Sequence, residues 1–263
     1  MRFRLPAVLT LCVAAVLGSG VTFAAPLKIG TTAAFAPPLE AAVAEAKKQG
    51  LEVELVEFND WITPNTALSN KDLDANYFQH IPFLENANKT AGLNLVAVAP
   101  GIINNIGLYS KKYTRVQDLP DGARVAIAND AINGGRGLLL LEKAGLLTLK
   151  PGVGYHATLG DITANPKHIQ IIELEAVQLA RVLDDVDLAQ GYPHYIRLAK
   201  TIDPNAALLF DGVDHPEYVI QFVARPDNRD DPRLKQFIRV YQQSPVVRQA
   251  LDQAYGKLYQ PGW

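Results

Sequence analysis

The sequence predicts an α/β fold of two lobes, in which mainly parallel sheets are flanked by helices and a ligand cleft lies between the lobes. Short apolar runs with strand character alternate with longer helical patterns along the chain. This alternation is typical of parallel sheets that helices cover on both faces. The series of elements begins again near the middle of the chain, and no repeat, low-complexity tract or long linker interrupts it. Two such series indicate two lobes.

The first series lies before residue 109. Residues 51–58 alternate in polarity with a period close to two, as in a strand that is covered on one face. Residues 37–49 are rich in alanine and are followed by Gly50, which is typical of a helix and its end. In order, the predicted elements are a strand at 27–30, a helix at 37–49, a strand at 51–58, a helix at 81–90 and a strand at 93–98.

The second series ends by returning to the first lobe. Residues 118–122 have the composition of a turn, and Gly145 ends a predicted helix. In order, the predicted elements are strands at 106–110 and 124–128, a helix at 134–144, a strand at 169–173, a helix at 176–183, an extended run at 186–190, a strand at 218–224 and closing helices within 232–255. We expect residues 25–108 and 217–263 to form lobe 1, and residues 109–216 to form lobe 2.

The first 24 residues predict a cleavable signal peptide. Arg2 and Arg4 give a basic start, and the apolar run at 5–17 is too short to span a bilayer. Small residues at Thr22 and Ala24 suit a cleavage site. The only cysteine, Cys12, lies inside the apolar run and not at the cleavage point, where a lipoprotein needs it. We therefore expect a periplasmic protein that is free rather than lipid-anchored.

Composition and motifs exclude several classes of function. Without Arg2 and Arg4 the chain has 25 − 2 = 23 basic and 27 acidic residues, a net charge near −4, so nucleic acid is not an expected partner. The sequence contains no nucleophile elbow and no phosphate-binding glycine loop. The five histidines do not have the spacing of zinc ligands. The acidic pairs at 173–175 and 184–187 fit solvated faces or caps better than acid–base catalysis. We expect neither an enzyme nor a metal or cofactor site.

Three segments carry residues that suit the capture of a small molecule. Trp61 follows a strand, at the edge where open α/β sheets bind ligands, although it also fits an ordinary core. Phe78 and His80 belong to an aromatic cluster that fits the wall of an apolar pocket, although a lone histidine is commonly structural. Arg136 lies in the predicted first turn of a helix. Its guanidinium fits either the capture of a carboxylate or a surface ion pair.

The same segments resemble the methionine-binding MetQ/NlpA (lipoprotein-9) family of ABC-importer binding proteins. The resemblance rests on motifs over nearly the whole mature chain, at residues 60–65, 74–80, 107–112, 118–127, 129–136, 161–167, 173–176 and 185–187. It implies a periplasmic binding protein-like fold whose lobes close on an amino acid. By position, it also implies that Trp61, Phe78 and His80 line a side-chain pocket and that Arg136 binds the ligand carboxylate.

Two departures from the family pattern concern the polar end of the ligand. Family members that bind methionine usually have asparagines where Tyr192, His194 and Ile220 stand in this chain. A site built on buried amides discriminates strongly, because losing one partner leaves another unpaired. We include these three residues in the predicted ligand site, and the loss of the amides favours a ligand other than methionine.

The sequence thus predicts a monomeric periplasmic substrate-binding component of an ABC importer. It would bind methionine or a related amino acid, derivative or short peptide, and deliver it to a permease and ATPase complex. Three alternatives stay open: a binding protein for a different small carboxylate without an α-amino group, a periplasmic enzyme on the same scaffold, and an interaction protein that has lost transport.

Overall fold

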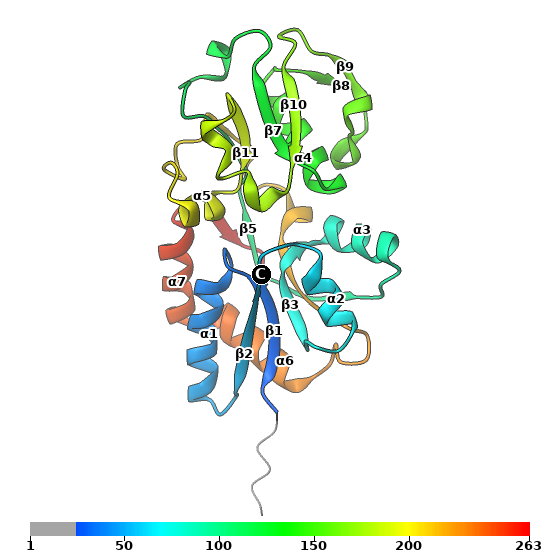
Figure 1. Ribbon diagram of the computed structural model, residues 1–263. Helices are drawn as coiled ribbons and strands as arrows, with labels where there is room; N and C mark the ends of the chain where they lie inside the picture. Colours follow the sequence, from blue (N-terminus) through cyan, green and yellow to red (C-terminus); the bar gives the residue numbers. More distant parts are fainter. Residues whose placement is uncertain (1–24) are drawn as a thin grey trace, which may run out of the picture.

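The computed structural model describes residues 25–263 (Figure 1). The predicted signal peptide at residues 1–24 lies outside the described residues. Within residues 25–263, no helix combines the length and apolar character that crossing a membrane requires.

A five-stranded sheet, which we call the first sheet, has the strand order β2-β1-β3-β13-β4. Its strands β2, β1 and β3 run parallel, whereas β13 runs antiparallel to both β3 and β4. The strands are β1 (Leu27–Thr32), β2 (Val53–Phe58), β3 (Ala75–His80), β4 (Val96–Pro100) and β13 (Ile220–Ala224).

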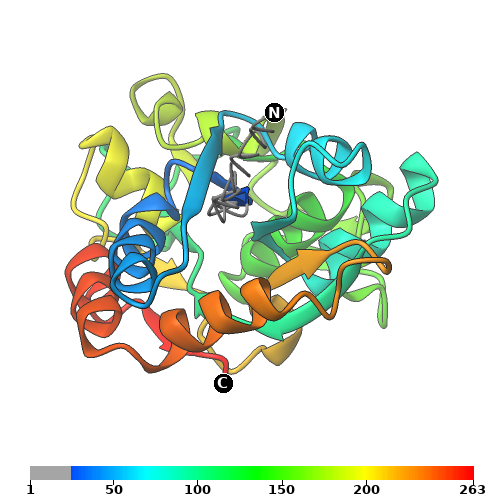
Figure 2. The same cartoon turned by 90° about the horizontal axis from the view of Figure 1, so that it is seen from below.

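Helices cover both faces of the first sheet, and they are α1 (Ala36–Lys48), α2 (Thr63–Ser69), α3 (Ile81–Ala91), α6 (Pro232–Gln243) and α7 (Pro245–Tyr255). Neighbouring residues of β13 point to opposite faces. Phe222 packs in the core that α1, α6 and α7 share, whereas Val223 packs with Leu68 of α2 and Leu84 of α3. Figure 2 shows α1, α6 and α7 (blue, orange and red) gathered away from α2 and α3 (cyan).

The second sheet also has five strands, in the order β10-β7-β11-β6-β12. Strands β10, β7 and β11 are parallel, whereas β6 runs antiparallel to β11 and to β12. The sheet, its helices and a small hairpin comprise β6 (Gly107–Tyr109), β7 (Arg124–Ala128), α4 (Ala131–Lys143), β8 (Thr148–Leu149), β9 (Ile162–Ala164), β10 (Gln170–Leu174), β11 (Leu188–Gly191), α5 (Pro193–Ala199) and β12 (Leu209–Phe210).

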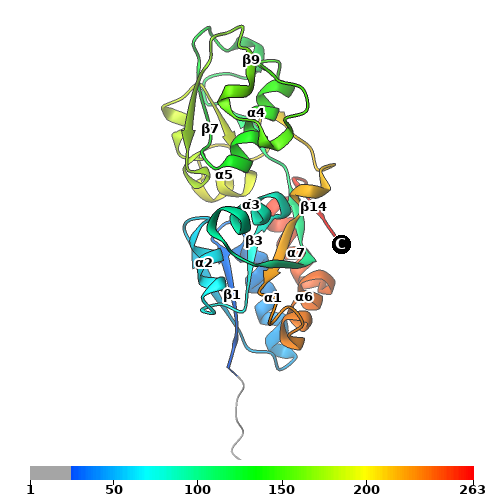
Figure 3. The ribbon, with the colours of Figure 1, turned by 90° about the vertical axis from the view of Figure 1, so that its right-hand side faces the viewer.

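Two crossing segments, residues 104–107 and 210–219, join the two halves. Figure 3 shows the halves stacked one above the other, with these segments at one side. Within them, the backbone N–H of Ile106 donates to Asp211 Oδ1 at 2.8 Å, and the Asp211 N–H donates to the Ile106 carbonyl at 3.0 Å. Beside the first crossing, β5 (Ile102–Asn104) pairs antiparallel with the C-terminal β14 (Tyr259–Pro261). The crossings are therefore bonded to each other.

The predicted α/β class with mainly parallel sheets is confirmed, since four of the five strands in each sheet run in the same direction. The fifth strand of each sheet runs against the other four. It is β13 in the first sheet, which re-enters from the second half, and β6 in the second sheet, which enters from the first half. Most predicted elements agree with the structure to within three residues. The elements α2, β3 and α5 were not predicted, and all six residues of β3 are buried, so no alternation in polarity marks that strand.

Two predicted helices differ from the structure. The helix predicted at 176–183 is wrong, because Ala176–Gln178 and Val182–Asp184 form two separate 3₁₀ turns. The helix predicted at 134–144 begins earlier, at Ala131, because the Asp130 carboxylate caps it by accepting from the Asn133 N–H at 2.9 Å. Arg136 therefore lies in the second turn of α4 and not in the first.

Candidate ligand-binding site

A cavity lies between the two halves of the molecule. It is narrow in this conformation, with about 30 Å³ of space open to the centre of a water-sized sphere. Both halves and both crossing segments contribute to its wall, which consists of Phe35, Trp61, Phe78, Gln79, His80, Phe83, Asn104, Asn133, Arg136, Tyr192, His194, Tyr218 and Ile220.

All seven residues that the sequence singled out line this one cavity. They come from the loop after β2, from β3 and β13 of the first sheet, from α4, and from the β11–α5 junction of the second half, and they are Trp61, Phe78, His80, Arg136, Tyr192, His194 and Ile220. The structure thus brings together residues that lie up to 159 positions apart, from Trp61 to Ile220. Their roles toward a ligand stay predictions.

Aromatic side chains form one end of the cavity, which we call the aromatic end and define by Trp61, Phe78, Phe83 and Tyr192. The Trp61 ring meets Phe83 and Tyr192 edge-on, with centroids 6.1 and 5.3 Å apart. Phe78 and Phe83 also meet edge-on, at 5.9 Å. The Trp61 Nε1–H donates to the hydroxyl of Tyr195 at 3.0 Å. Edge-on rings attract each other beyond the effect of burial, so these contacts stabilise the aromatic end. The indole N–H of Trp61 is also paired, through its bond to Tyr195.

His80 has a structural role as well as a place in the cavity wall. It is the N-cap of α3, where its Nδ1 accepts from the Phe83 N–H at 3.3 Å. Its Nε2 lies 3.3 Å from Asn133 Oδ1. Since Nδ1 accepts, the ring proton belongs on Nε2, which then donates to Asn133. His80 therefore stabilises the start of α3, as the structural interpretation of this histidine predicted, and it also lines the cavity.

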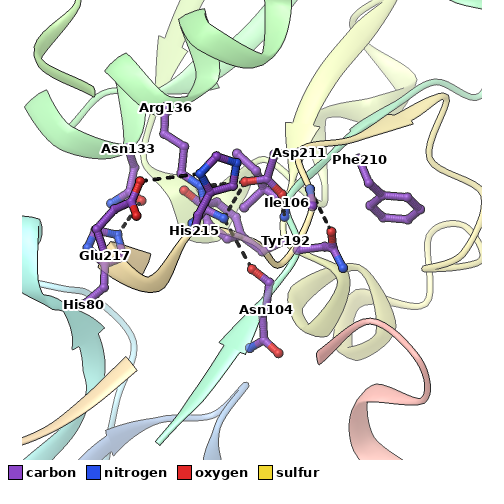
Figure 4. A network of polar contacts seen from close by, with 12 residues as sticks. His80, Asn104, Ile106, Asn133, Arg136, Tyr192, Phe210, Asp211, His215 and Glu217 are labelled. Carbon is purple, nitrogen blue, oxygen red and sulfur yellow. Dashed lines mark hydrogen bonds and ion pairs between the residues drawn. The ribbon is translucent and has the colours of Figure 1, made fainter. Parts of the chain in front are cut away.

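Arg136 and Asp211 form a buried ion pair at the other end of the cavity (Figure 4). Arg136 Nε and Nη2 donate to Asp211 Oδ2 at 2.9 and 2.5 Å, and Nη2 also lies 3.3 Å from the Asn104 carbonyl. Only 5% of the Arg136 side chain and 10% of the Asp211 side chain are exposed. The guanidinium carbon lies 4.0 Å from the centre of the Tyr218 ring. The expected ion pair of Arg136 is thus real, but it is buried and not at the surface.

Several polar atoms at this end have no partner within residues 25–263. Both amide atoms of Asn104, Oδ1 and Nδ2, are buried and make no hydrogen bond. The same holds for Nδ1 of His194, elsewhere in the cavity wall. No described atom accepts a hydrogen bond from Arg136 Nη1. Buried polar groups in proteins are nearly always paired, so unpaired ones in a cavity wall are candidates for contact with a ligand. We call Asn104, Arg136 and Asp211 the polar end.

Burial keeps both histidines of the cavity neutral. Burial, and after it the positive charge of Arg136, lowers the pKa of His80 and that of His194 to about 3. Burial raises the pKa of Tyr192 well above its usual value. A neutral His194 keeps a lone pair on one ring nitrogen and can accept a hydrogen bond there.

The sequence did not single out several residues of this site. They are Phe35, Gln79, Phe83, Asn104, Asn133, Asp211 and Tyr218. Asn104 and Asp211 lie in the crossing segments, where the two predicted series of elements meet. The one feature of the sequence that could have pointed to Asn104 and Asp211 is that they are polar residues at this junction. The residues 184–187, considered for catalysis, instead make surface ion pairs, with Lys111 bonded to Asp184 and Lys112 to Asp187.

A model of the family described as NlpA lipoprotein matches residues 27–263. The chain belongs to this family. It is 46% identical over 219 residues to Lipoprotein 28 of Escherichia coli O157:H7, and 43% identical over 221 residues to the D-methionine-binding lipoprotein MetQ of E. coli K12. Each alignment covers 82% of this chain and 80% of the relative.

Solved structures of similar proteins share the fold. The chain superimposes on a crystal structure of the methionine binding protein MetQ with a TM-score of 0.86 at 41% identity, covering 90% of this chain and 98% of that one. It superimposes on a nutrient binding protein from Burkholderia cenocepacia bound to methionine with a TM-score of 0.84 at 37% identity, covering 90% and 100%. The predicted family resemblance and periplasmic binding protein-like fold are confirmed, and membership of a binding-protein family confirms that the chain is not an enzyme.

Proposed function

We propose that this NlpA-family chain is the substrate-binding component of an ABC importer and captures methionine or a related amino acid, derivative or short peptide. One observation carries the proposal: a single cavity joins an aromatic end to a polar end that has unpaired hydrogen-bonding atoms. An apolar amino acid has the same two parts. The relatives, which include a D-methionine-binding lipoprotein and a protein bound to methionine, support the same ligand class.

In this proposal different residues of the cavity contact different parts of the ligand. Trp61 and Phe78 surround its apolar side chain, with His80 at the edge of that wall. Arg136 binds the carboxylate through Nη1, since its Nε and Nη2 are bonded to the protein. Tyr192, His194 and Ile220 surround the remainder of the ligand. They stand where the family resemblance implies asparagines, which favours a second candidate, a binding protein of altered specificity.

We further propose how the chain would move. Residues 25–108 with 217–263 form one lobe, residues 109–216 form the other, and the crossing segments act as the hinge between them. A ligand that touches both lobes binds the closed state more tightly than the open one, and this difference in affinity drives closure. The protein would act as a monomer in the periplasm. Its closed form would be the one that the permease and ATPase complex recognises. The mass of the mature protein tests whether it is free, as we propose, or carries a lipid.

Thermal unfolding in the presence of candidate ligands tests this function. The set contains L- and D-methionine, other apolar amino acids, methionine-containing dipeptides and small organic acids. We expect the largest rise in Tm with methionine or a close relative. A larger rise with another compound would establish altered specificity, and no rise with any compound would contradict a role in amino-acid capture. The mass of any small molecule that co-purifies with the protein identifies the ligand independently.

A further inference from the structure

We propose that Asp211 is the residue that selects the ligand by charge, so that the cavity accepts zwitterionic α-amino acids and rejects the corresponding organic acids. The inference rests on the proposed function and deepens it, because it states which charged groups a ligand must carry. It also decides against a carboxylate without an α-amino group.

The geometry gives Arg136 an anion of its own. Asp211 Oδ2 accepts from both Nε and Nη2 of Arg136, and Asp211 Oδ1 accepts from the Ile106 N–H at 2.8 Å. The carboxylate is thereby fixed by the backbone of one crossing segment while it belongs to the other. It does not line the cavity, so it acts on a ligand through Arg136 and through its charge.

A second carboxylate, that of Asp130, lies near the site at a partly exposed position. Asp130 caps α4 and bonds to both the backbone N–H and the side-chain amide of Asn133, which lines the cavity. Lys143, at an exposed position, bonds to the carbonyls of Phe210 and Asp211. Water screens charges at such positions, whereas buried charges act on one another strongly. The surroundings of Arg136 therefore carry no excess positive charge.

This charge balance has different consequences for different ligands. A lone carboxylate at Arg136 Nη1 would add an uncompensated negative charge close to Asp211, and burying such a charge is costly. An α-amino acid brings an ammonium group with its carboxylate and leaves the balance unchanged. Two acceptors without partners, Asn104 Oδ1 and His194 Nδ1, border the same cavity and can bind the ammonium hydrogens.

Matched pairs of ligands test this selection. Each pair consists of an amino acid and the acid that lacks only its α-amino group: methionine with 4-(methylsulfanyl)butanoate, and norleucine with hexanoate. Isothermal titration gives the ratio of the two Kd values for the full mature chain and for the variant Asp211→Asn. Asp214→Asn is the control, because it removes the same charge at an exposed position three residues along the chain.

We expect the unmodified chain to bind the amino acid at least tenfold more tightly than its acid, and Asp211→Asn to reduce this ratio at least tenfold, mainly by tightening the binding of the acid. Asp214→Asn keeps the original ratio. If Asp211 merely held Arg136 in position, Asp211→Asn would weaken both ligands in parallel and leave the ratio unchanged, which would overturn the inference.

The preference of the unmodified chain is a second test, which stands even where Asp211→Asn does not fold. Equal affinity for an amino acid and its acid would also overturn the inference while leaving the proposed function intact. If neither member of any pair binds, the proposed function and this inference fail together.

Discussion

The aromatic end and the polar end of the cavity differ in how many of their side chains find a partner within the protein when no ligand is bound. At the aromatic end the rings pack on one another and the Trp61 N–H is bonded to Tyr195. At the polar end both amide atoms of Asn104 lack partners, and Arg136 uses only part of its guanidinium. Side chains that satisfy one another stabilise the fold, whereas unpaired buried groups cost stability. The incomplete end is therefore where the ligand contributes most.

This difference predicts separate effects of mutation. At the aromatic end, truncation should reduce both stability and binding, because the same ring contacts serve both. At the polar end, truncation of an unpaired side chain such as Asn104 should reduce binding far more than stability, a trade-off common at binding and catalytic sites. Three substitutions test the comparison, from the largest expected effect to the smallest.

Arg136→Ala should have the largest effect on binding. It removes the proposed carboxylate partner and leaves Asp211 buried without its cation, so affinity should fall by about 2–4 kcal/mol, as when one partner of a buried charged pair is removed. Isothermal titration measures the change. Arg239→Ala, at an exposed position, is the control and should bind normally. Affinity of Arg136→Ala within about twofold of the unmodified chain would show that Arg136 does not anchor the ligand.

Asn104→Ala separates binding from stability. Since the Asn104 side chain has no partner in the free protein, its removal should leave the free energy of unfolding unchanged or slightly raised, while ligand affinity falls by about 1–3 kcal/mol. Urea unfolding and titration measure the two quantities.

The matched control for Asn104→Ala is Asn65→Ala. Asn65 is a buried amide that bonds to Gln79 and Asn76, so its loss should lower the free energy of unfolding. If Asn104→Ala destabilised the protein as much as Asn65→Ala does, the polar end would not be incomplete.

The sequence predicted the aromatic end better than the polar end, for a physical reason. Trp61 and Phe78 stand in recognisable motifs beside strand ends, and Arg136 is conspicuous at a turn that opens a helix. Asp211 and Asn104, in contrast, act through a partner about 75 or 32 residues away in sequence. No local pattern encodes such a distant pairing, since it arises only when the two crossing segments meet.

The fold shows the same limit. The alternation in polarity located β2, and the alanine content with the following Gly50 located α1. These signals missed β3, which is buried on both faces. They also cut the start of α4 short, because Gly134 and Gly135 resemble a turn. A β-carbon at Gly135 would collide with the carbonyl oxygen of Tyr155, so this glycine serves close packing inside the helix.

The substitution His194→Phe should have the smallest effect of the three. It tests whether the His194 ring carries no charge in the folded protein. The pKa of His194 is lowered to about 3 by burial and by Arg136, so in acid the unfolded chain takes up a proton that the folded chain does not. Stability conferred by the neutral ring is therefore full above pH 6.5 and is lost progressively as the pH falls toward 3. The slope is about 1.4 kcal/mol per pH unit. His80, whose pKa is also lowered to about 3, adds a similar slope.

His194→Phe should remove one of these two contributions. Between pH 6 and pH 5 the variant should lose roughly 1 kcal/mol less of its unfolding free energy than the unmodified chain, as urea titrations at both pH values would measure. His156→Phe, at an exposed position, is the control and should follow the unmodified chain. An identical loss in His194→Phe and the unmodified chain would mean that His194 takes up its proton while folded. The polar end would then face a second cation, and the neutral charge balance around Arg136 and Asp211 would no longer hold.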